Sequence, residues 1–233
     1  SFVSRGLGDV YKRQTFGFNT ILTDQHTLLR GVSLSWDGGD PYGSQPKVMP
    51  SSVQLQRLAE SFGLNTIHVY LEGNASQNPN PVGVNLLDAD ALVAATRTAG
   101  LYLILTIGCN GENGSIHSMD FARDFWSLYA PRYKDETHVI FEAHNEPALY
   151  TPSQWTVQDW NRQVELYHHI RERAPNSLIL LGSFMGFAGD PTFGINFLQA
   201  NGVAWDNCGL AHHGYESKAC LLYTSPSPRD TNE

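Results

Sequence analysis

Short apolar runs alternate with amphipathic stretches along most of the chain. Each run contains few polar residues, as expected for strands buried on both faces of a parallel sheet. The predicted strands cover residues 28–34, 65–71, 101–107, 138–143, 178–181 and 208–211. Between them, apolar residues at helical spacing predict helices over 53–62, 88–99, 121–128 and 157–167, with a fifth after Pro191. This alternation predicts a parallel sheet with right-handed helical crossovers.

The repeated strand–helix unit favours a barrel over an open sheet. The units occur without the Gly-x-Gly-x-x-Gly turn that opens a dinucleotide-binding sheet. The glycine-rich segment from Gly111 to Gly114 matches no phosphate-binding loop. A complete eight-unit barrel typically needs roughly 250 residues. We therefore predict an α/β fold, a (β/α)8 TIM barrel truncated after about strand six.

The two ends of the chain are related at the nucleotide level. Residues 4–14 read SRGLGDVYKRQ and residues 220–230 read CLLYTSPSPRD. One codon choice for the first segment has a reverse complement that, shifted by one base, encodes CLLYTSPSPR. The pair resembles a sequencing adapter translated from opposite strands. We therefore expect 1–14 and 220–233 to be non-native flanks around one partial domain at 15–219.

Charge and cysteine content exclude several classes of partner. The chain has a formal net charge of −8, and leaving out the flanks makes it one unit more negative. An acidic domain without a basic stripe argues against nucleic acids and anionic membranes as partners. Outside the flanks, Cys109 and Cys208 form neither a disulfide framework nor a metal-ligand spacing. We expect no metal and no cofactor.

The most informative motif is His144-Asn145-Glu146-Pro147, which closes the apolar run at 138–143. Proline cannot donate to a strand ladder, so the chain leaves the sheet there. In parallel α/β folds the carboxyl ends of the strands carry the chemistry. Glu146 is therefore a candidate catalytic acid, and a helix-entry residue beside a turn is the alternative interpretation. Within the strand, Glu142 is expected to have a buried hydrogen-bonding role, and His144 is given no catalytic role.

Three motifs, in their order along the chain, resemble a known family. They are Arg-Gly-Val-Ser at 30–33 on the first predicted strand, Asn-Glu-Pro at 145–147 after the fourth, and His-Gly-Tyr at 213–215 after the sixth. Together they resemble the retaining glycoside hydrolases of the cellulase type, family 5 in clan A. That resemblance implies a (β/α)8 barrel that cleaves β-linked polysaccharides.

The resemblance also implies roles for individual residues. Glu146 would be the general acid/base, and Asn145 would bond the 2-hydroxyl of the substrate. His213 and Tyr215 would line the cleavage site and bind the sugar. A retaining enzyme needs a second carboxylate about 5 Å away as its nucleophile. In this family that glutamate ends strand seven, which we expect to lie beyond Ala219.

Two positions depart from the family pattern. His68 stands near the place of an arginine that usually ends the second strand, and residues 108–110 (Gly-Cys-Asn) stand where a histidine usually ends the third. These departures keep a non-catalytic carbohydrate-binding barrel open as a second hypothesis. A clan relative of other specificity, such as a mannanase or a β-1,3-glucanase, is a third.

Several further side chains are candidates with two interpretations. Trp36, just after the first predicted strand, is either a sugar-stacking platform or a core residue. Trp160 fits the apolar stripe of its helix and is expected to pack against the barrel. Arg30 is expected to support the barrel floor or an active-site carboxylate. The residues at strand ends that could line subsites are Tyr70, Glu72, Asn110 and Glu112.

The expected parent protein is a secreted monomer that acts on a β-linked polysaccharide or oligosaccharide. Without strands seven and eight, the first and sixth strands would be open edges with unpaired backbone groups. The polypeptide as it stands is therefore expected to be inactive as a hydrolase and poorly soluble.

Overall fold

A parallel sheet of six strands forms the centre of the molecule in the computed structural model, which describes residues 28–34, 49–72, 82–108, 117–147, 156–184 and 192–211. The strands pair in chain order, so each lies beside the next. They are β1 (Gly31–Leu34), β2 (Thr66–Tyr70), β3 (Tyr102–Thr106), β4 (Val139–Glu142), β5 (Ile179–Leu181) and β6 (Cys208–Leu210). Each predicted strand is confirmed, although each observed strand is shorter than its apolar run.

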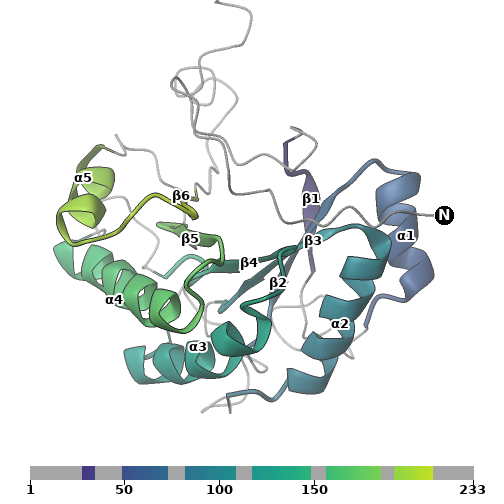
Figure 1. The fold of residues 1–233 in the computed structure, drawn as a ribbon, viewed down its shortest axis with the longest axis horizontal. Helices are drawn as coiled ribbons and strands as arrows, with labels where there is room; N and C mark the ends of the chain where they lie inside the picture. Colours follow the sequence, from purple (N-terminus) through teal and green to yellow (C-terminus); the bar gives the residue numbers. More distant parts are fainter. Residues whose placement is uncertain are drawn as a thin grey trace, which may run out of the picture.

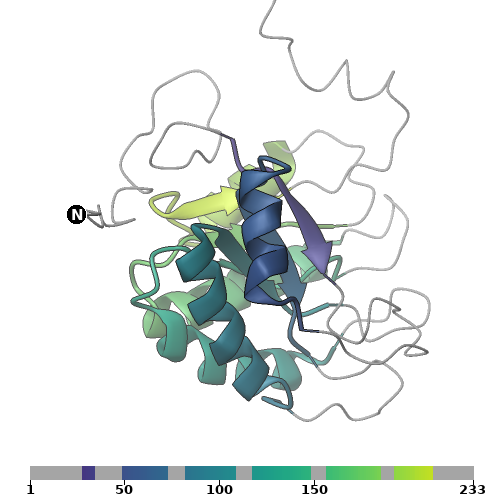
Figure 2. The ribbon, with the colours of Figure 1, turned by 90° about the vertical axis from the view of Figure 1, so that its right-hand side faces the viewer.

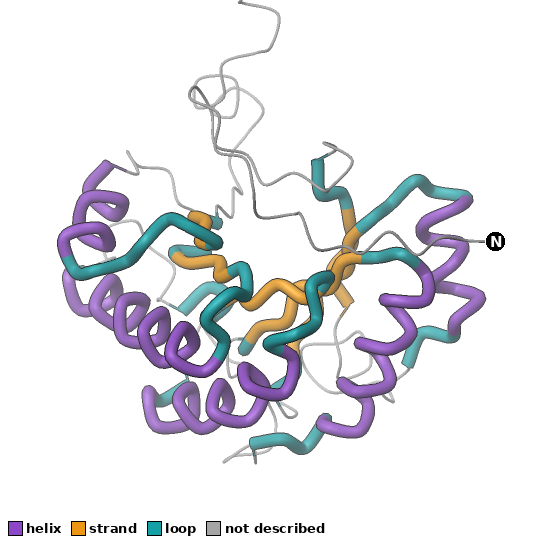
Figure 3. The backbone as a smooth tube through the Cα atoms, viewed as in Figure 1, coloured by secondary structure: helices purple, strands orange, loops and turns teal. Residues whose placement is uncertain are grey.

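Within the described residues, five helices connect these strands and lie on one side of the sheet. They are α1 (Ser52–Glu60), α2 (Leu86–Ala99), α3 (Met119–Tyr133), α4 (Val157–Arg173) and α5 (Thr192–Ala200). Figure 1 shows the helices following one another around the outer side of the curved sheet, and the tube in Figure 3 shows the same two layers. Figure 2, turned so that α1 faces the viewer, shows this helix in front of β1 at one edge of the sheet. Strands in sequential order with all helices outside are the winding of a (β/α)8 barrel, whereas a doubly wound sheet would reverse its order.

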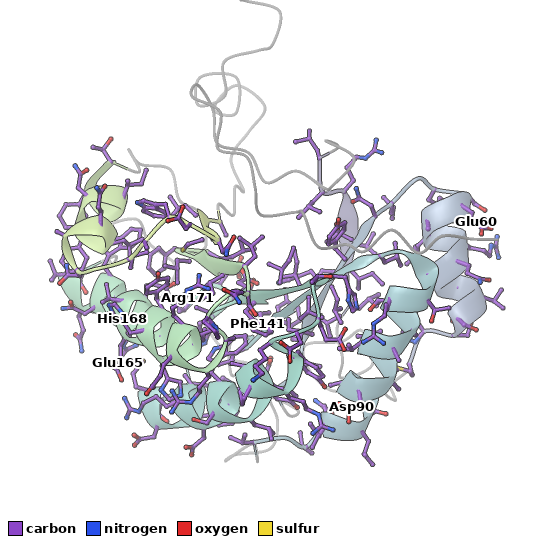
Figure 4. The ribbon with its side chains drawn as sticks, in the orientation of Figure 1. Glu60, Asp90, Phe141, Glu165, His168 and Arg171 are labelled. Carbon is purple, nitrogen blue, oxygen red and sulfur yellow. The ribbon has the colours of Figure 1, made fainter. Side chains whose placement is uncertain are left out.

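Side chains alternate along the strands between two hydrophobic clusters. Residues that face the helices, such as Leu103 and Phe141, join the larger cluster together with helix residues such as Trp126. Residues one position away, such as Tyr102 and Ile140, form a smaller cluster in the barrel interior. Figure 4 places Phe141 between the sheet and the helices. The period of two therefore assigns every strand residue to the helix layer or to the interior.

Local signals set the helix ends as the sequence suggests. Ser51 and Gln54 form a capping box at the start of α1, and the Ser51 side chain accepts from the Gln54 backbone. Gly100 ends α2 with φ of 69°, the left-handed conformation that glycine adopts without steric penalty. Among the helices that the structure describes, none is both long and apolar enough to cross a membrane.

Arg171 joins α4 to the loops that enter β5 and β6. Its guanidinium donates to the carbonyls of Pro175, Ser177 and Asn207, each at 2.8 Å. Figure 4 shows Arg171 on the side of α4 that faces the strands. The planar five-donor fork of arginine suits several acceptors at once, and lysine cannot reproduce it.

We expect Arg171→Ala to lower the free energy of unfolding by roughly 1.5–3 kcal/mol, because several charge-assisted hydrogen bonds are lost together. Arg171→Lys should recover only part of this loss. Urea denaturation followed by circular dichroism measures both. Arg57→Ala, at an exposed site near the end of α1, is the matched control and should change stability by less than about 0.5 kcal/mol. Equal effects of the two alanine variants would contradict this role for Arg171.

Candidate active site at the carboxyl end of the sheet

The backbone after β4 remains fixed to both neighbouring strands. The N–H of Asn145 donates to Ile107 O, just past β3, at 2.8 Å. The N–H of Glu146 donates to Ser183 O, just past β5, also at 2.8 Å. These bonds hold the Asn-Glu pair at the carboxyl rim of the sheet, the location predicted from the motif.

Glu146 has a backbone conformation that side chains rarely adopt. Its φ is 47°, in the left-handed region. For a residue other than glycine this conformation is uncommon, and sparsely populated backbone conformations cost on the order of 1–3 kcal/mol. Such strain persists where the surrounding structure enforces it, and it clusters at functional sites. The turn therefore fixes the position of Glu146 at a cost in local backbone stability.

Asn145 and Glu146 are both largely withdrawn from solvent. Their exposed fractions are 4 % and 8 %, and among the described residues none is hydrogen-bonded to the Oδ1 atom of Asn145. Leaving a buried acceptor unsatisfied costs about 1–3 kcal/mol. A hydroxyl group of a bound ligand would satisfy this acceptor.

Other carboxylates lie near Tyr70 at the end of β2. Burial raises the pKa of the Tyr70 phenol, and the negative charges of Glu142, Glu146 and Glu72 raise it further. Glu72 accepts a hydrogen bond of 2.6 Å from the Gly108 N–H, across the ends of β2 and β3. The candidate subsite residues Tyr70 and Glu72 therefore lie at the same rim as Glu146.

Glu142 has the structural partner expected of a carboxylate inside a strand. It is 2 % exposed, and its Oε2 atom is hydrogen-bonded to His68 Nε2. The other ring nitrogen of His68, Nδ1, lies 3.2 Å from Ser33 Oγ on β1. His68, which stands near the place of the family arginine, thus connects β1 with β4 through the barrel interior.

A pair of buried imidazoles, His117 and His144, adjoins the Asn-Glu pair, because His144 directly precedes Asn145 in the chain. The ring centroids of His117 and His144 are 6.3 Å apart, and no residue in the described ranges is hydrogen-bonded to the Nε2 atom of either ring. Burial, together with the nearby His117, lowers the pKa of His144 to about 3. Burial also lowers the pKa of His117 to about 4. Both rings are neutral in the folded protein near pH 7.

The two imidazoles predict loss of stability in mild acid. Because the unfolded chain binds protons with an ordinary histidine pKa of about 6.5 and the folded chain does not, protonation favours unfolding. Stability should fall as the pH drops from about 6.5 toward 4. His117→Gln/His144→Gln should flatten this part of the profile, measured as the thermal midpoint at each pH, whereas His168→Gln on the exposed side of α4 should not. An unchanged slope in the double variant would contradict the prediction.

The remaining predicted residues divide into two groups. Trp36, His213, Tyr215, Asn110 and Glu112 lie outside the described residues, as do the two flanks. Trp160 is 2 % exposed in the larger core, which confirms its packing role. Arg30, immediately before β1, is exposed. Within the described residues, no group of three or more histidine, cysteine or acidic side chains could hold a metal ion.

Two features of the site were missed at the level of sequence. Ser33 and His117 received no role, although both lie beside predicted site residues. The interior position of Ser33 follows from its alternation with Leu29, which packs in the interior cluster. No comparable signal marks His117, because its contact with His144 depends on the path of the chain between β3 and α3.

Comparisons with solved structures give the same fold. The chain is 18% identical to the cellulase Cel5C_n, with a TM-score of 0.59, covering 84% of this chain and 60% of that one. A Thermobifida fusca endoglucanase Cel5A catalytic domain in complex with cellotetraose is 20% identical, with a TM-score of 0.55 and coverages of 83% and 62%. XacCel5A in complex with cellopentaose is 19% identical, with a TM-score of 0.62 and coverages of 82% and 67%.

These likenesses show the (β/α)8 fold, and the chain spans about three fifths of the length of the first structures. No curated protein sequence matches it. The family model of the cellulases, glycosyl hydrolase family 5, matches residues 21–219, which is most of the chain. The chain therefore belongs to the cellulase family, glycosyl hydrolase family 5.

Proposed function

We propose that this chain is part of a retaining β-glycanase in which Glu146 is the general acid/base. The observation that carries the proposal is the Asn145–Glu146 pair at the rim of β4, nearly buried and fixed by backbone bonds to both neighbouring strands. A buried carboxyl group, beside an amide acceptor to which no described residue is hydrogen-bonded, suits a reaction that exchanges a proton with a bound sugar.

The chemistry proceeds in two steps. Glu146 first protonates the glycosidic oxygen that leaves, and the same carboxylate then removes a proton from the incoming water. The Oδ1 atom of Asn145 accepts from the 2-hydroxyl of the sugar, a bond that strengthens in the transition state. The nucleophile is a second carboxylate about 5 Å from Glu146, which we propose lies on the part of the barrel that would follow residue 219.

The substrate we propose is a β-linked glucan. The supporting observation is that two structures of the same fold hold cellotetraose and cellopentaose. We assign His213 and Tyr215 to sugar binding at the cleavage site, and Trp36 to stacking on a pyranose face. A polymeric substrate cannot enter a cell, so the parent enzyme would act outside it, as a monomer with no nucleic-acid or membrane partner.

We further propose that 1–14 and 220–233 are non-native flanks around a partial domain. The range of the family match, 21–219, lies inside the proposed domain limits. On this proposal the 233-residue chain lacks the nucleophile, and its outer strands β1 and β6 lack partners that a closed barrel would supply.

We expect the purified chain to hydrolyse neither cello-oligosaccharides nor barley β-glucan, and to be poorly soluble. The complete parent enzyme should hydrolyse β-1,4-glucan faster than mannan, xylan or β-1,3-glucan, measured as reducing ends released. If the 233-residue chain hydrolyses a glucan with retention, and Glu146→Ala abolishes this activity, the proposal that the chain lacks the nucleophile is refuted. A folded parent enzyme that binds but cleaves none of the four polymers would support a non-catalytic barrel instead.

A further inference from the structure

Ser33, His68 and Glu142 form a hydrogen-bonded series. The two steps proposed for the glycosidase reaction give these three residues no role. Ser33 Oγ lies 3.2 Å from His68 Nδ1, and His68 Nε2 is hydrogen-bonded to Glu142 Oε2. The three residues differ in accessibility: Ser33 is exposed, whereas the side chains of His68 and Glu142 are 18% and 2% exposed. The series therefore runs from an accessible hydroxyl, through an imidazole, to a buried carboxylate.

This arrangement meets the geometric conditions for an activated serine. A nucleophile and its base must lie within about 3.2 Å, and a third group must orient the base. The buried Glu142 carboxylate fixes the tautomer of His68, because it accepts the proton on Nε2 and leaves Nδ1 free to take the proton of Ser33. In the serine proteases Nε2 faces the serine and Nδ1 faces the carboxylate. Here the two nitrogens exchange these partners, which the near symmetry of imidazole allows.

A donor for the developing oxyanion lies beside the serine. The Tyr70 phenol lies near Ser33, whose hydroxyl lowers the pKa of the phenol, and the Tyr70 ring meets that of His68 edge-on at 5.0 Å. Tyrosine hydroxyl groups are among the donors that stabilise tetrahedral intermediates. Burial and nearby carboxylates raise the pKa of Tyr70, so the phenol keeps the proton that it must donate.

We propose that Ser33, His68 and Glu142 form a second hydrolytic site, specific for short neutral acyl esters, with Tyr70 as the oxyanion donor. Ser33 Oγ forms a bond to the acyl carbon while its proton moves to His68 Nδ1, and the carbonyl oxygen becomes an oxyanion bonded to Tyr70. Collapse of this intermediate breaks the ester C–O bond, and the leaving alkoxide takes the proton from His68. Water, deprotonated by His68, then releases the carboxylic acid and restores Ser33.

The local charge selects the acyl group. Three carboxylates, those of Glu72, Glu142 and Glu146, act on Tyr70, which would contact the acyl oxygen. A negatively charged acyl chain would be repelled there, whereas an acetyl group would not. Acetate esters should therefore react faster than hemisuccinate esters.

The test uses the 233-residue chain, shown to be folded by cooperative thermal unfolding, with a fluorophosphonate probe and p-nitrophenyl acetate. We expect the probe to modify Ser33, located by peptide mass mapping, and Ser33→Ala to abolish labelling and lower ester hydrolysis at least about a hundredfold. Tyr70→Phe and Glu142→Gln should each slow labelling while Ser33 remains the modified residue. p-Nitrophenyl hemisuccinate should react more slowly than the acetate.

Ser127 provides a matched control. Its Oγ lies 3.0 Å from His169 Nε2, but in the described part of the chain no carboxylate is hydrogen-bonded to that imidazole. Ser127→Ala should leave labelling and ester hydrolysis unchanged. A folded chain that is not labelled, labelling at Ser127, or ester hydrolysis that persists in Ser33→Ala would each overturn the proposal. Because the readout is ester chemistry, its outcome is independent of the proposed glycanase reaction.

Discussion

Glu146→Gln in the complete parent enzyme is expected to lower kcat on β-1,4-glucan by about 10²–10⁴-fold, the usual contribution of a general acid. The amide keeps the size of the side chain but cannot protonate the leaving oxygen. The rate of the first step, cleavage of the glycosidic bond, should fall far less for an aryl cellobioside with an acidic phenol as leaving group, because that leaving group needs no proton. Pre-steady-state release of the phenol measures this step directly.

The backbone at residue 146 should keep the variant side chain in place. Glu146 is held in a left-handed turn by a backbone bond to Ser183, so the variant side chain should occupy the same place. Glu60→Gln, at the outer end of α1 in Figure 4, is the matched control and should leave kcat unchanged. Equal loss on the glucan and on the activated aryl glycoside would show that the variant has damaged the site in another way.

Trp126→Ala is expected to destabilise the protein by about 3–5 kcal/mol, the usual cost of removing a fully buried aromatic side chain. Trp126 is 0% exposed, and its ring packs on Phe141 with centroids 5.2 Å apart. Its indole N–H donates to Ala143 O at 2.8 Å, three residues before Glu146. The side chain therefore supports both the core and the strand end that carries the candidate acid. Chemical denaturation followed by far-ultraviolet circular dichroism, a signal from the backbone rather than from tryptophan, measures the change in the free energy of unfolding.

Two further variants separate these contributions. Trp126→Phe keeps most of the packing but leaves the Ala143 carbonyl unpaired, which should cost about 1–3 kcal/mol. Phe62→Ala, at a residue that is 66% exposed, should change stability by less than about 0.5 kcal/mol. A Trp126→Ala effect as small as that of Phe62→Ala would contradict the assignment of Trp126 to the core.

The fold could be predicted from the sequence because its determinants are local and periodic. Apolar runs such as 101–107 identify strands buried on both faces, and Gly100 ends the preceding helix in the left-handed conformation that only a few residues adopt readily. Strand order followed from the short connections, since each strand–helix unit places its next strand alongside. The predicted ends of the strands were less accurate, because the backbone pairing between strands stops before the apolar run does.

The candidate site could be predicted only in part, because its contacts join residues far apart in the chain. The position of Glu146 follows from a strand that ends at a proline, which is a local signal. The bond between His68 and Glu142 spans 74 residues, and the contact between His117 and His144 depends on how two loops meet at the rim. Such contacts are set by strand register and by the barrel interior, and a sequence pattern does not contain them.

The most direct test of the central claim, that Glu146 is the acid/base of a retaining reaction, is the stereochemistry of azide rescue. In Glu146→Ala of the complete enzyme with an activated aryl cellobioside, the glycosyl-enzyme should accumulate because no base activates water. Azide should then attack it in place of water, restore turnover and give the β-cellobiosyl azide, identified by NMR. Formation of the α-azide would make Glu146 the nucleophile instead, and an absence of rescue in a folded variant that retains full activity would exclude it from the reaction.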